Sequence, residues 1–499
     1  MGALKSVSET LMPSQLAWRR LLRQGKSVRS RHSKKKRSLL TILISAAAFF
    51  ACGRLLQAAA LASPADSSSS AIAAGGTCRA NAAPNAANDT QYLVFWTPLP
   101  GATPDSLGES VKAFATKLGT TGDGKTRQLG FGVTLPFFVS DEAQTIQAIA
   151  EGFEIARRTN VAVHFNFDDH IRWDGRPDLW NWYDPAKPGY NPENKKNVEW
   201  YDWDGTPNKR RYLTPAGVPS QAPHMCYNSP AILTQISRIV SLVIGPTFSK
   251  EIDELKQENR GYLFAGITVG AELGFDDYSR IPRLSSIPPN LDPVHKQFLK
   301  MLVRANQMMD ADGAPHSRLG YCSLTNAGYS KTNPPADFDA ALADVNRKFI
   351  AFWDKQFFDN GIPCSRLYTH VPASAPQDDT NDDPISNAFN LYARPGWTTY
   401  PVETLADGFE PLYQELAEHG NPAWGGVEAN ASFGDPGGAA RVSWEEYLAW
   451  HYNHGARLVG INVGAADQSL VSSLSNAAFS DQAIAAYKKF LNGEKLIGK

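Results

Sequence analysis

Short runs of β-branched and aromatic residues alternate with amphipathic helical patterns along the chain from residue 91 onward. This alternation is typical of an α/β protein in which helices cover a parallel sheet. Eight such runs favour a closed (β/α)8 barrel, or TIM barrel, over a doubly wound sheet, and no GxGxxG turn supports the latter. The runs lie at 92–97, 129–136, 161–167, 264–271, 366–371, 395–400, 424–428 and 457–463.

Helix start signals between these runs support the barrel. Ser229 and Pro230 provide an N-cap and a first-turn proline before apolar residues at helical spacing. Ser443 and Glu446 form a capping box ahead of the last run. The helices are therefore predicted to alternate with the strands.

Two connections are much longer than a simple turn: residues 168–228 after the third run, and residues 273–335 after the fourth. The active site of a (β/α)8 barrel lies at the carboxyl ends of its strands, so both loops are predicted to line it. The first is too rich in Trp and Tyr to be disordered. We expect it to have its own packed structure.

Residues 1–62 are predicted to be a signal peptide or an N-terminal membrane anchor. They hold twelve Lys or Arg against one acid, Glu9, followed by an apolar run over 39–53. That run is shorter than the roughly 20 residues of a membrane span. Residues 63–90, rich in Ser, Ala, Gly and Asn, are predicted to be a flexible linker, which leaves 91–499 as the barrel domain. We therefore expect an exported protein that is periplasmic, extracellular or membrane-tethered.

The charge of the chain without its leader excludes a basic nucleic-acid-binding surface. Removing residues 1–62 leaves 37 basic against 49 acidic residues, a formal charge of −12. Export would permit disulfides among the remaining cysteines, whose spacing matches no zinc site and leaves their connectivity open. These cysteines are Cys78, Cys226, Cys322 and Cys364.

Two glutamates stand at the ends of predicted strands. Glu272 follows the fourth run and Glu428 ends the seventh. In a barrel these side chains face each other across the mouth. Hydrolysis of a glycosidic bond requires one protonated carboxyl group to release the leaving oxygen and one ionised carboxylate to meet the oxocarbenium-like centre. A Glu/Glu pair at these positions therefore indicates a glycosidase.

On these residues the chain from 91 to about 490 resembles the clan A glycoside hydrolases, which are retaining (β/α)8 barrels. The resemblance implies that Glu272 is the acid/base, that Glu428 is the nucleophile, and that their carboxyl groups are about 5–5.5 Å apart. It also implies contact between Tyr400 and the nucleophile. The clan usually has Asn before the acid/base, where this chain has Ala271. Either Asn166 replaces that contact with the sugar, or the pair works by inversion at wider separation.

Other residues near strand ends are predicted to bind the sugar substrate. The stretch 165–205 combines tryptophans with polar side chains, as in sites that bind the apolar faces and hydroxyl rims of sugars. About half of its tryptophans are equally expected to form a small loop core. The predicted substrate-binding residues are Asn166, Asp168, Asp169, His170, Trp173, His370, Trp397, Tyr400 and Asn462.

The sequence thus predicts an exported glycoside hydrolase that acts on a poly- or oligosaccharide without a metal or other cofactor. One alternative is a barrel that binds carbohydrate without cleaving it, because the Asn before Glu272 is missing. Another is a metal-dependent hydrolase, since His164, Asn166 and Asp168 alternate along one strand face. Against it, the first run lacks the HxH pair of amidohydrolase-type barrels. The sugar, the linkage and the oligomeric state stay open.

Overall fold

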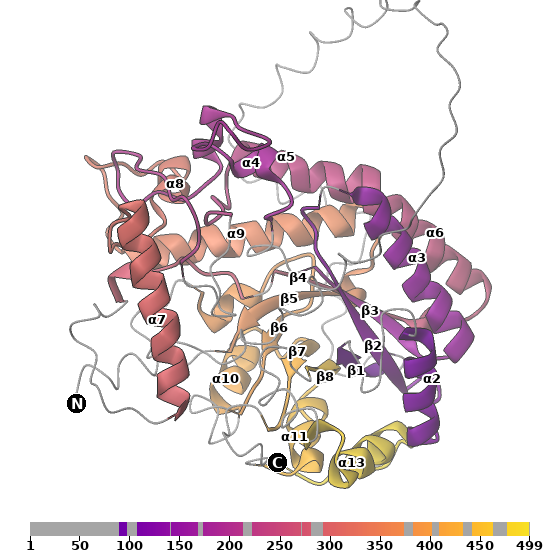
Figure 1. Ribbon diagram of the computed structural model, residues 1–499. Coiled ribbons are helices and arrows are strands. Elements are labelled where there is room, and N and C mark those ends of the chain that lie inside the picture. The colour runs from indigo at the N-terminus through magenta and orange to yellow at the C-terminus, as the bar shows by residue number, and fades with distance from the viewer. Residues whose placement is uncertain are drawn as a thin grey trace, which may run out of the picture.

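Eight parallel strands close into a barrel in the order in which they occur in the chain (Figure 1). This computed structural model describes residues 89–96, 107–139, 141–167, 173–212, 222–270, 272–280, 293–373, 383–401, 409–432, 442–462 and 477–498. All eight predicted strands are confirmed. They are β1 (Gln91–Trp96), β2 (Arg127–Leu135), β3 (Ala162–Phe167), β4 (Phe264–Gly270), β5 (Leu367–Pro372), β6 (Gly396–Thr398), β7 (Trp424–Ala429) and β8 (Ala456–Ile461).

Helices cover the outside of the barrel (Figure 1). Among the described residues the longer ones are α2 (Leu107–Leu118), α3 (Glu142–Thr159), α5 (Pro230–Arg238), α6 (Gly245–Gln257), α7 (Pro293–Asp312), α9 (Phe338–Asp359), α10 (Glu410–Glu418), α11 (Trp444–Tyr452) and α13 (Asp481–Leu491). Shorter helical pieces are α4 (Pro177–Trp180), η4 (Pro192–Lys196), η5 (Ile239–Ile244), η6 (Gly261–Leu263), η7 (Tyr278–Arg280), α8 (Tyr321–Asn326), η9 (Cys364–Arg366) and η10 (Ile385–Ala388).

The predicted helix starts are found in the structure. The Ser443 hydroxyl accepts a hydrogen bond from the Glu446 amide at 3.1 Å, as the capping box requires. Ser229 precedes α5, but its hydroxyl donates to Asn197 Oδ1 at 2.7 Å and caps nothing. That serine therefore ties the start of α5 to the long loop after β3.

The helix α5 continues through η5 into α6 with a single π-helical segment. The Gly245 amide donates to the Val240 carbonyl five residues earlier, and Pro246, which has no N–H to donate, follows directly. By length and composition alone the run Pro230–Gln257 could cross a membrane. However, Phe248 packs its ring 5.1 Å from that of Phe165 on the barrel wall.

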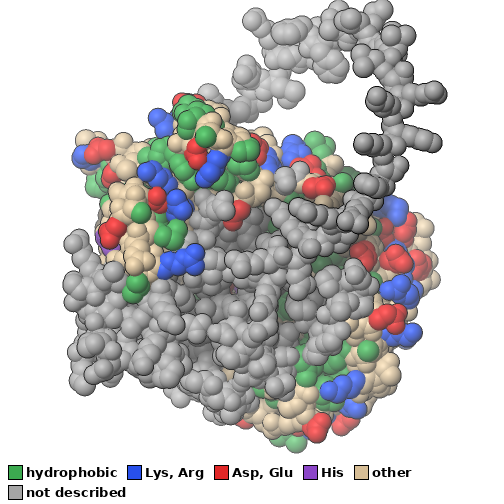
Figure 2. Space-filling view, viewed as in Figure 1, with side chains coloured by type: hydrophobic (Ala, Val, Ile, Leu, Met, Phe, Trp, Pro, Cys, Tyr) green, Lys and Arg blue, Asp and Glu red, His purple; other side chains and the backbone are tan. Residues whose placement is uncertain are grey.

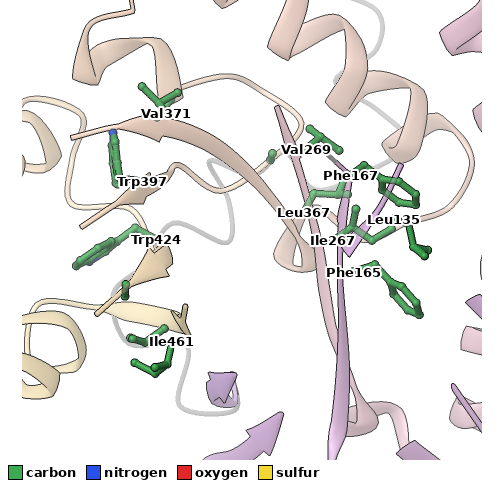
Figure 3. Close-up of a cluster of buried hydrophobic side chains, with 14 of the residues drawn as sticks. Leu135, Phe165, Phe167, Ile267, Val269, Leu367, Val371, Trp397, Trp424 and Ile461 are labelled. Atoms are coloured by element: carbon green, nitrogen blue, oxygen red, sulfur yellow. The ribbon is translucent and has the colours of Figure 1, made fainter. Parts of the chain in front are cut away.

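The outward-facing side chains of the strands form the main hydrophobic core with these helices. Figure 3 shows Phe165, Phe167, Ile267 and Val269 from neighbouring strands gathered on this face. Burying each such side chain contributes about 1.5–3 kcal/mol. Aromatic side chains at the outward-facing positions of the strands therefore pack against the helices and do not reach the inside of the barrel.

Below the polar mouth, side chains fill the inside of the barrel, so the barrel is not an open channel. Tyr92, Val94, Tyr368 and Leu458 are fully buried together there with Ala162, Ala265 and Val427. Gly460 leaves room for the indole ring of Trp96, because a Cβ at this position would lie 2.6 Å from the indole nitrogen. The mouth above this layer holds the polar groups.

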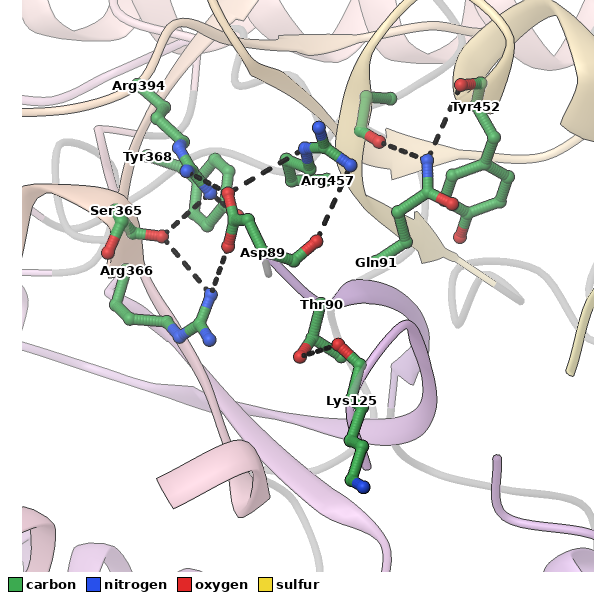
Figure 4. Close-up of polar contacts among 11 residues, drawn as sticks. Asp89, Thr90, Gln91, Lys125, Ser365, Arg366, Tyr368, Arg394, Tyr452 and Arg457 are labelled. Carbon is green, nitrogen blue, oxygen red and sulfur yellow. Dashed lines mark hydrogen bonds and ion pairs between the residues drawn. The ribbon is translucent and has the colours of Figure 1, made fainter. Parts of the chain in front are cut away.

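The amino-terminal end of the barrel is closed by ion pairs (Figure 4). Asp89 contacts Arg366 at 3.3 Å, Arg457 at 3.7 Å, and Arg394. The Thr90 hydroxyl donates to the Lys125 carbonyl at 2.9 Å. Asp89 and Thr90, which the sequence analysis placed at the end of the linker, are thus packed against the barrel.

The loop after β3 is packed, as its Trp and Tyr content predicted: Trp173 and Trp180 join the main hydrophobic core, and Tyr201 and Tyr212 form a small cluster with residues after β4. Trp180 Nε1 donates to the Trp173 carbonyl at 2.9 Å, and both rings are buried. The buried Arg211–Asp276 ion pair joins this loop to the segment after β4. Burial alone would raise the pKa of Asp276, but the Arg211 charge outweighs it and holds this pKa below its ordinary value. Figure 2 shows hydrophobic and charged side chains of this region mixed on the surface near α4 and α5.

Candidate active site

Polar side chains from five neighbouring strands meet at the carboxyl end of the barrel. β5 contributes His370 and β6 contributes Thr398, with Tyr400 two residues further on. β7 contributes Glu428, Glu272 follows β4, and Asn462 follows β8. Parallel strands end at one face of a barrel, which is why residues so distant in sequence converge here.

Glu272 is held by an unusual backbone conformation. Its φ is +55°, in the left-handed region that a non-glycine residue rarely adopts, and Gly270 before it has a φ of +108°. The Glu272 amide donates to the His370 carbonyl at 3.1 Å, which fixes the turn. The side chain is half-buried, and its Oε1 accepts a hydrogen bond from the Thr398 hydroxyl. Such strain costs about 1–3 kcal/mol and is concentrated at functional sites.

Glu428 lies deeper, with 7% of its surface exposed. Its Oε1 accepts hydrogen bonds from the Tyr400 hydroxyl at 2.5 Å and from Asn462 Nδ2 at 2.7 Å. Burial and the neighbouring Glu428 charge raise the pKa of Tyr400 well above its ordinary value, so its hydroxyl keeps the proton that it donates. These two donors fix the orientation of the carboxylate.

His370 connects the two glutamates. Its Nε2 lies 2.9 Å from the Thr398 hydroxyl and 3.3 Å from Glu428 Oε2. Because the Thr398 hydroxyl donates to Glu272, it accepts from His370, which assigns the His370 proton to Nε2. Three atoms that could bind a metal ion lie within 4.8 Å of one another, one each from Glu272, His370 and Glu428. The two carboxyl groups therefore face each other across a gap of a few ångströms.

A second polar layer lies next to these residues on β2, β3 and β4. His164 Nε2 is 2.8 Å from the Thr268 hydroxyl, and burial together with the His370 charge lowers the pKa of His164 to about 3. Asn166 is buried and pairs in register with Thr268. Among the described residues, Asn166 Oδ1 and the Thr134 hydroxyl have no hydrogen-bond partner. Buried polar atoms of this kind are sites where bound water or substrate can be accommodated.

The structure brings together Glu272, Glu428, His370, Tyr400 and Asn462, with Asn166 one strand further away. Asp168, Asp169 and His170 lie outside the described residues. Their part in substrate binding, and that of Asp168 in a metal site, stays a prediction.

Two predicted substrate-binding tryptophans are placed elsewhere. Trp173 is fully buried in the main hydrophobic core, with its Nε1 donating to the Pro223 carbonyl at 2.9 Å. Trp397 is also fully buried, and its Nε1 donates to the Ile385 carbonyl at 3.1 Å. On β6 it points opposite to Thr398 and packs beside Trp424 on the outer wall (Figure 3). Neither ring reaches the mouth.

Thr398 is the residue that sequence reasoning missed. It precedes Tyr400 by two positions, so strand alternation places both on the same inward face. The alternation of side chains around Tyr400 could have identified it.

Comparisons with known proteins found solved structures of low similarity. No protein-family model matches the chain, and no curated protein matches it either. Among solved structures, the catalytic domain of a β-amylase from Paenibacillus polymyxa matches at 10% identity and a TM-score of 0.41, covering 82% of this chain and 99% of that one.

Two further structures are family 5 glycoside hydrolases. One is a GH5_18 enzyme from Streptomyces cattleya in complex with GlcNAc, at 10% identity and a TM-score of 0.38, covering 83% of this chain and 82% of the other. The second is a family 5 enzyme from Prevotella bryantii, at 9% identity and a TM-score of 0.36, covering 79% and 98%. At these identities and TM-scores the likenesses carry no argument, and the closed barrel is established by the order of its strands.

Proposed function

We propose that this protein is a glycoside hydrolase that cleaves O-glycosidic bonds of an oligo- or polysaccharide by retention. The observation that carries the proposal is the pair formed by Glu272 and Glu428, whose nearest oxygens lie within 4.8 Å of each other. Retaining enzymes hold their carboxyl groups about 5–5.5 Å apart, whereas inverting enzymes leave about 6.5–9.5 Å for a water molecule. Nearest oxygens within 4.8 Å of each other agree with the retaining arrangement, and we assign Glu428 the role of nucleophile on this basis.

In the first step Glu272 protonates the leaving oxygen while Glu428 attacks the anomeric carbon. The bond to the leaving group breaks, its electron pair takes the Glu272 proton, and a glycosyl ester forms on Glu428. Tyr400 and Asn462 both donate to Glu428 Oε1, which leaves Oε2 as the attacking oxygen. His370 lies beside Oε2 and stabilises its charge before the attack.

In the second step water replaces the sugar on Glu428. The Glu272 carboxylate accepts the proton of this water, which attacks the anomeric carbon and returns Glu428 to its ionised form. Because the Thr398 hydroxyl donates to Glu272 Oε1, the other oxygen of Glu272 is directed to carry the proton in both steps. The His370–Thr398 pair thereby couples the positions of the two carboxyl groups.

The strained backbone of Glu272 separates this proposal from carbohydrate binding without cleavage. A residue that merely hydrogen-bonds a sugar has no need of a left-handed φ, and relaxing it would stabilise the fold. A carboxyl group that must approach both a leaving group and a water has a strict positional requirement. The strain is therefore expected of an acid/base.

The test is a panel of aryl glycosides and soluble polysaccharides, assayed for release of aglycone or reducing ends. Glu428→Gln should remove turnover on every substrate that the wild type cleaves and leave thermal unfolding unchanged. Glu109→Gln, the same change at an exposed position on α2, is the matched control and should behave as wild type. Near-normal turnover by Glu428→Gln, or binding of sugars with no cleavage by the wild type, would contradict the proposal.

We further propose that the protein is exported with its barrel outside the cytoplasm. The basic leader followed by an apolar run supports this, as does Cys364, which is disulfide-bonded. Cell fractionation with and without residues 1–62 tests the proposal. Retention of the shortened chain in the cytoplasm is the expected result, and export of that chain would contradict it.

The geometry also supports a second candidate, a metal-dependent hydrolase. The ligand atoms of Glu272, His370 and Glu428 are close enough to hold one divalent cation, and three protein ligands are typical of catalytic zinc sites. Elemental analysis of purified protein, followed by assay after chelator treatment, distinguishes the two. A stoichiometric metal with activity restored by Zn²⁺ would favour this candidate, and activity unaffected by chelator would exclude it.

A further inference from the structure

Two buried cysteines join the two long loops on the active-site face. Cys226 lies in the last segment of the loop after β3, and Cys322 lies in α8 within the loop after β4. The structure has both as free thiols, with Cys226 fully buried and Cys322 1% exposed. Neither residue takes part in the chemistry described above.

The contacts around these cysteines hold them against each other. The Cys226 amide donates to the Asn197 carbonyl at 2.9 Å, and Cys226 Sγ lies 3.7 Å from the hydroxyl of Ser323, the residue after Cys322. The Cys322 amide donates to the buried carboxyl group of Glu199 at 3.2 Å. Asn326 Nδ2, on the same helix as Cys322, donates to Cys226 Sγ at 3.3 Å. Both backbones are thus held by the segment 197–199, and Cys226 Sγ lies against the helix that carries Cys322.

We propose that Cys226 and Cys322 are oxidised to a disulfide that covalently links the two loops. The two thiols lose two electrons and two protons, and the disulfide of an oxidoreductase or of oxidised glutathione in the export compartment accepts them and becomes two thiols. This rests on the proposed export, because a reducing cytosol would keep the pair as thiols. It does not depend on which bond the enzyme cleaves.

Burial determines when this bond can form. Burial raises the pKa of the Cys226 thiol well above its ordinary value. The contact with Cys226 lowers the pKa of the Cys322 thiol, but burial and the nearby Glu199 carboxyl group outweigh it, so this pKa is raised as well. Thiol–disulfide exchange requires a thiolate that the oxidant can reach, which the folded state excludes. The bond therefore forms before the loops close and afterwards resists reductants in solution.

This disulfide would stabilise the segment that carries Glu272. Next to Cys226, the Tyr227 hydroxyl donates to the Gly274 carbonyl at 3.1 Å. His224 Nε2 approaches the same carbonyl at 2.8 Å and stacks its ring on Phe275. Gly274 is only two residues from the strained Glu272. Fixing Cys226 to α8 thus holds the two donors that position the chain after β4.

The direct test uses wild-type protein purified from the export compartment without reductant. The protein is unfolded in guanidinium with a thiol-alkylating reagent and digested without reduction. The expected product is one linked pair of peptides containing Cys226 and Cys322, 2 Da lighter than the sum of the two thiol peptides, with neither residue alkylated. Alkylation of both cysteines in the unreduced protein would overturn the proposal.

Variants provide a second measurement that separates this inference from the proposed function. Cys226→Ala, Cys322→Ala and the double variant should all melt at the same temperature, roughly 3–5 °C below wild type, because each removes the same bond. Melting shifts of the two single variants that add up in the double variant would show two independent thiols and contradict the bond. Glycosidase activity enters neither measurement, so its absence would refute the proposed function without touching the disulfide.

Discussion

The two ends of the barrel both carry acidic residues, but they surround them differently. At the amino-terminal end Asp89 is held by three guanidinium groups, those of Arg366, Arg394 and Arg457. At the carboxyl end Glu272 and Glu428 face each other, and the partners shown for them are hydroxyls, an amide and a histidine. One end pairs its carboxylate with arginines, and the other orients its carboxylates with hydroxyl, amide and imidazole groups.

This difference separates stability from chemistry. A carboxylate paired with several arginines at a closed end holds structure together, whereas a carboxylate oriented by hydroxyl, amide and imidazole groups at the mouth is placed to meet a substrate. The same barrel therefore places a structural acid at one end and reactive acids at the other. Substituting acids at the two ends should change different quantities.

The largest expected effect is on activity at the carboxyl end. Glu428→Gln should lower kcat by on the order of 10⁴-fold or more, since the nucleophile is removed. Glu272→Gln should lower it by about 10²–10⁴-fold on sugars with poor leaving groups and far less on nitrophenyl glycosides, whose leaving group needs no proton. Steady-state kinetics on both substrate types measures this. An equal loss on both for Glu272→Gln would contradict its role as acid.

At the amino-terminal end the expected effect is on stability. Asp89→Ala leaves three arginines without their common partner and should lower the free energy of unfolding by about 3–5 kcal/mol. Urea denaturation measures it, and kcat per folded molecule should stay at the wild-type value. A drop in kcat with unchanged stability would remove the distinction between the two ends.

A smaller effect is expected from the hydroxyl that links the two glutamates. Thr398→Val removes the donor to Glu272, and a hydrogen bond to a charged group is worth about 1.5–3 kcal/mol, or roughly 10- to 150-fold in kcat. Losing a donor that favours the ionised carboxylate should also move the alkaline limb of the pH–rate profile to higher pH. Thr398→Ser keeps the hydroxyl and should restore both. If the serine and valine variants behave alike, Thr398 only packs.

A further effect, on the pH dependence of stability, concerns Asp354, an acid in neither group. It is buried in α9 with one hydrogen-bond donor, Asn390 Nδ2 at 2.8 Å, and burial raises its pKa to about 8. Because this pKa lies above that of the unfolded chain, stability is fully present below about pH 4 and decreases as the pH rises towards 8, by about 1.4 kcal/mol per pH unit at most.

Asp354→Asn should flatten this pH dependence and stabilise the protein at neutral pH. Urea denaturation between pH 5 and pH 8 compares the variant with wild type. The variant's advantage should grow with pH. An advantage that is constant over this range would show that Asp354 does not titrate in it.

The fold and the two glutamates could be predicted because they depend on local pattern. Alternating strands and helices determine the barrel, and a barrel places any residue that ends a strand at its mouth, so Glu272 and Glu428 stood out from the sequence. Trp173 and Trp397 were assigned to the site by composition. Composition does not tell which face of a strand or loop is buried, and both rings pack into cores.

Contacts between residues far apart in the chain could not be read from the sequence. The Thr398 hydroxyl has its partner at Glu272, and Asp89 has its arginines at 366, 394 and 457. Neither pairing follows a periodic pattern. The adjacency of Cys226 and Cys322 likewise depends on how two long loops fold against each other.

The central claim is that Glu428 becomes covalently attached to the sugar across a short gap from Glu272. A glycoside with a 2-fluoro substituent and a good leaving group slows hydrolysis of such an intermediate, so that it can be detected by mass spectrometry of the intact protein and its peptides. We predict one adduct per chain, located on the peptide that contains Glu428 and absent from Glu428→Gln. Labelling at another residue, or a product of inverted configuration with no adduct, would contradict the account.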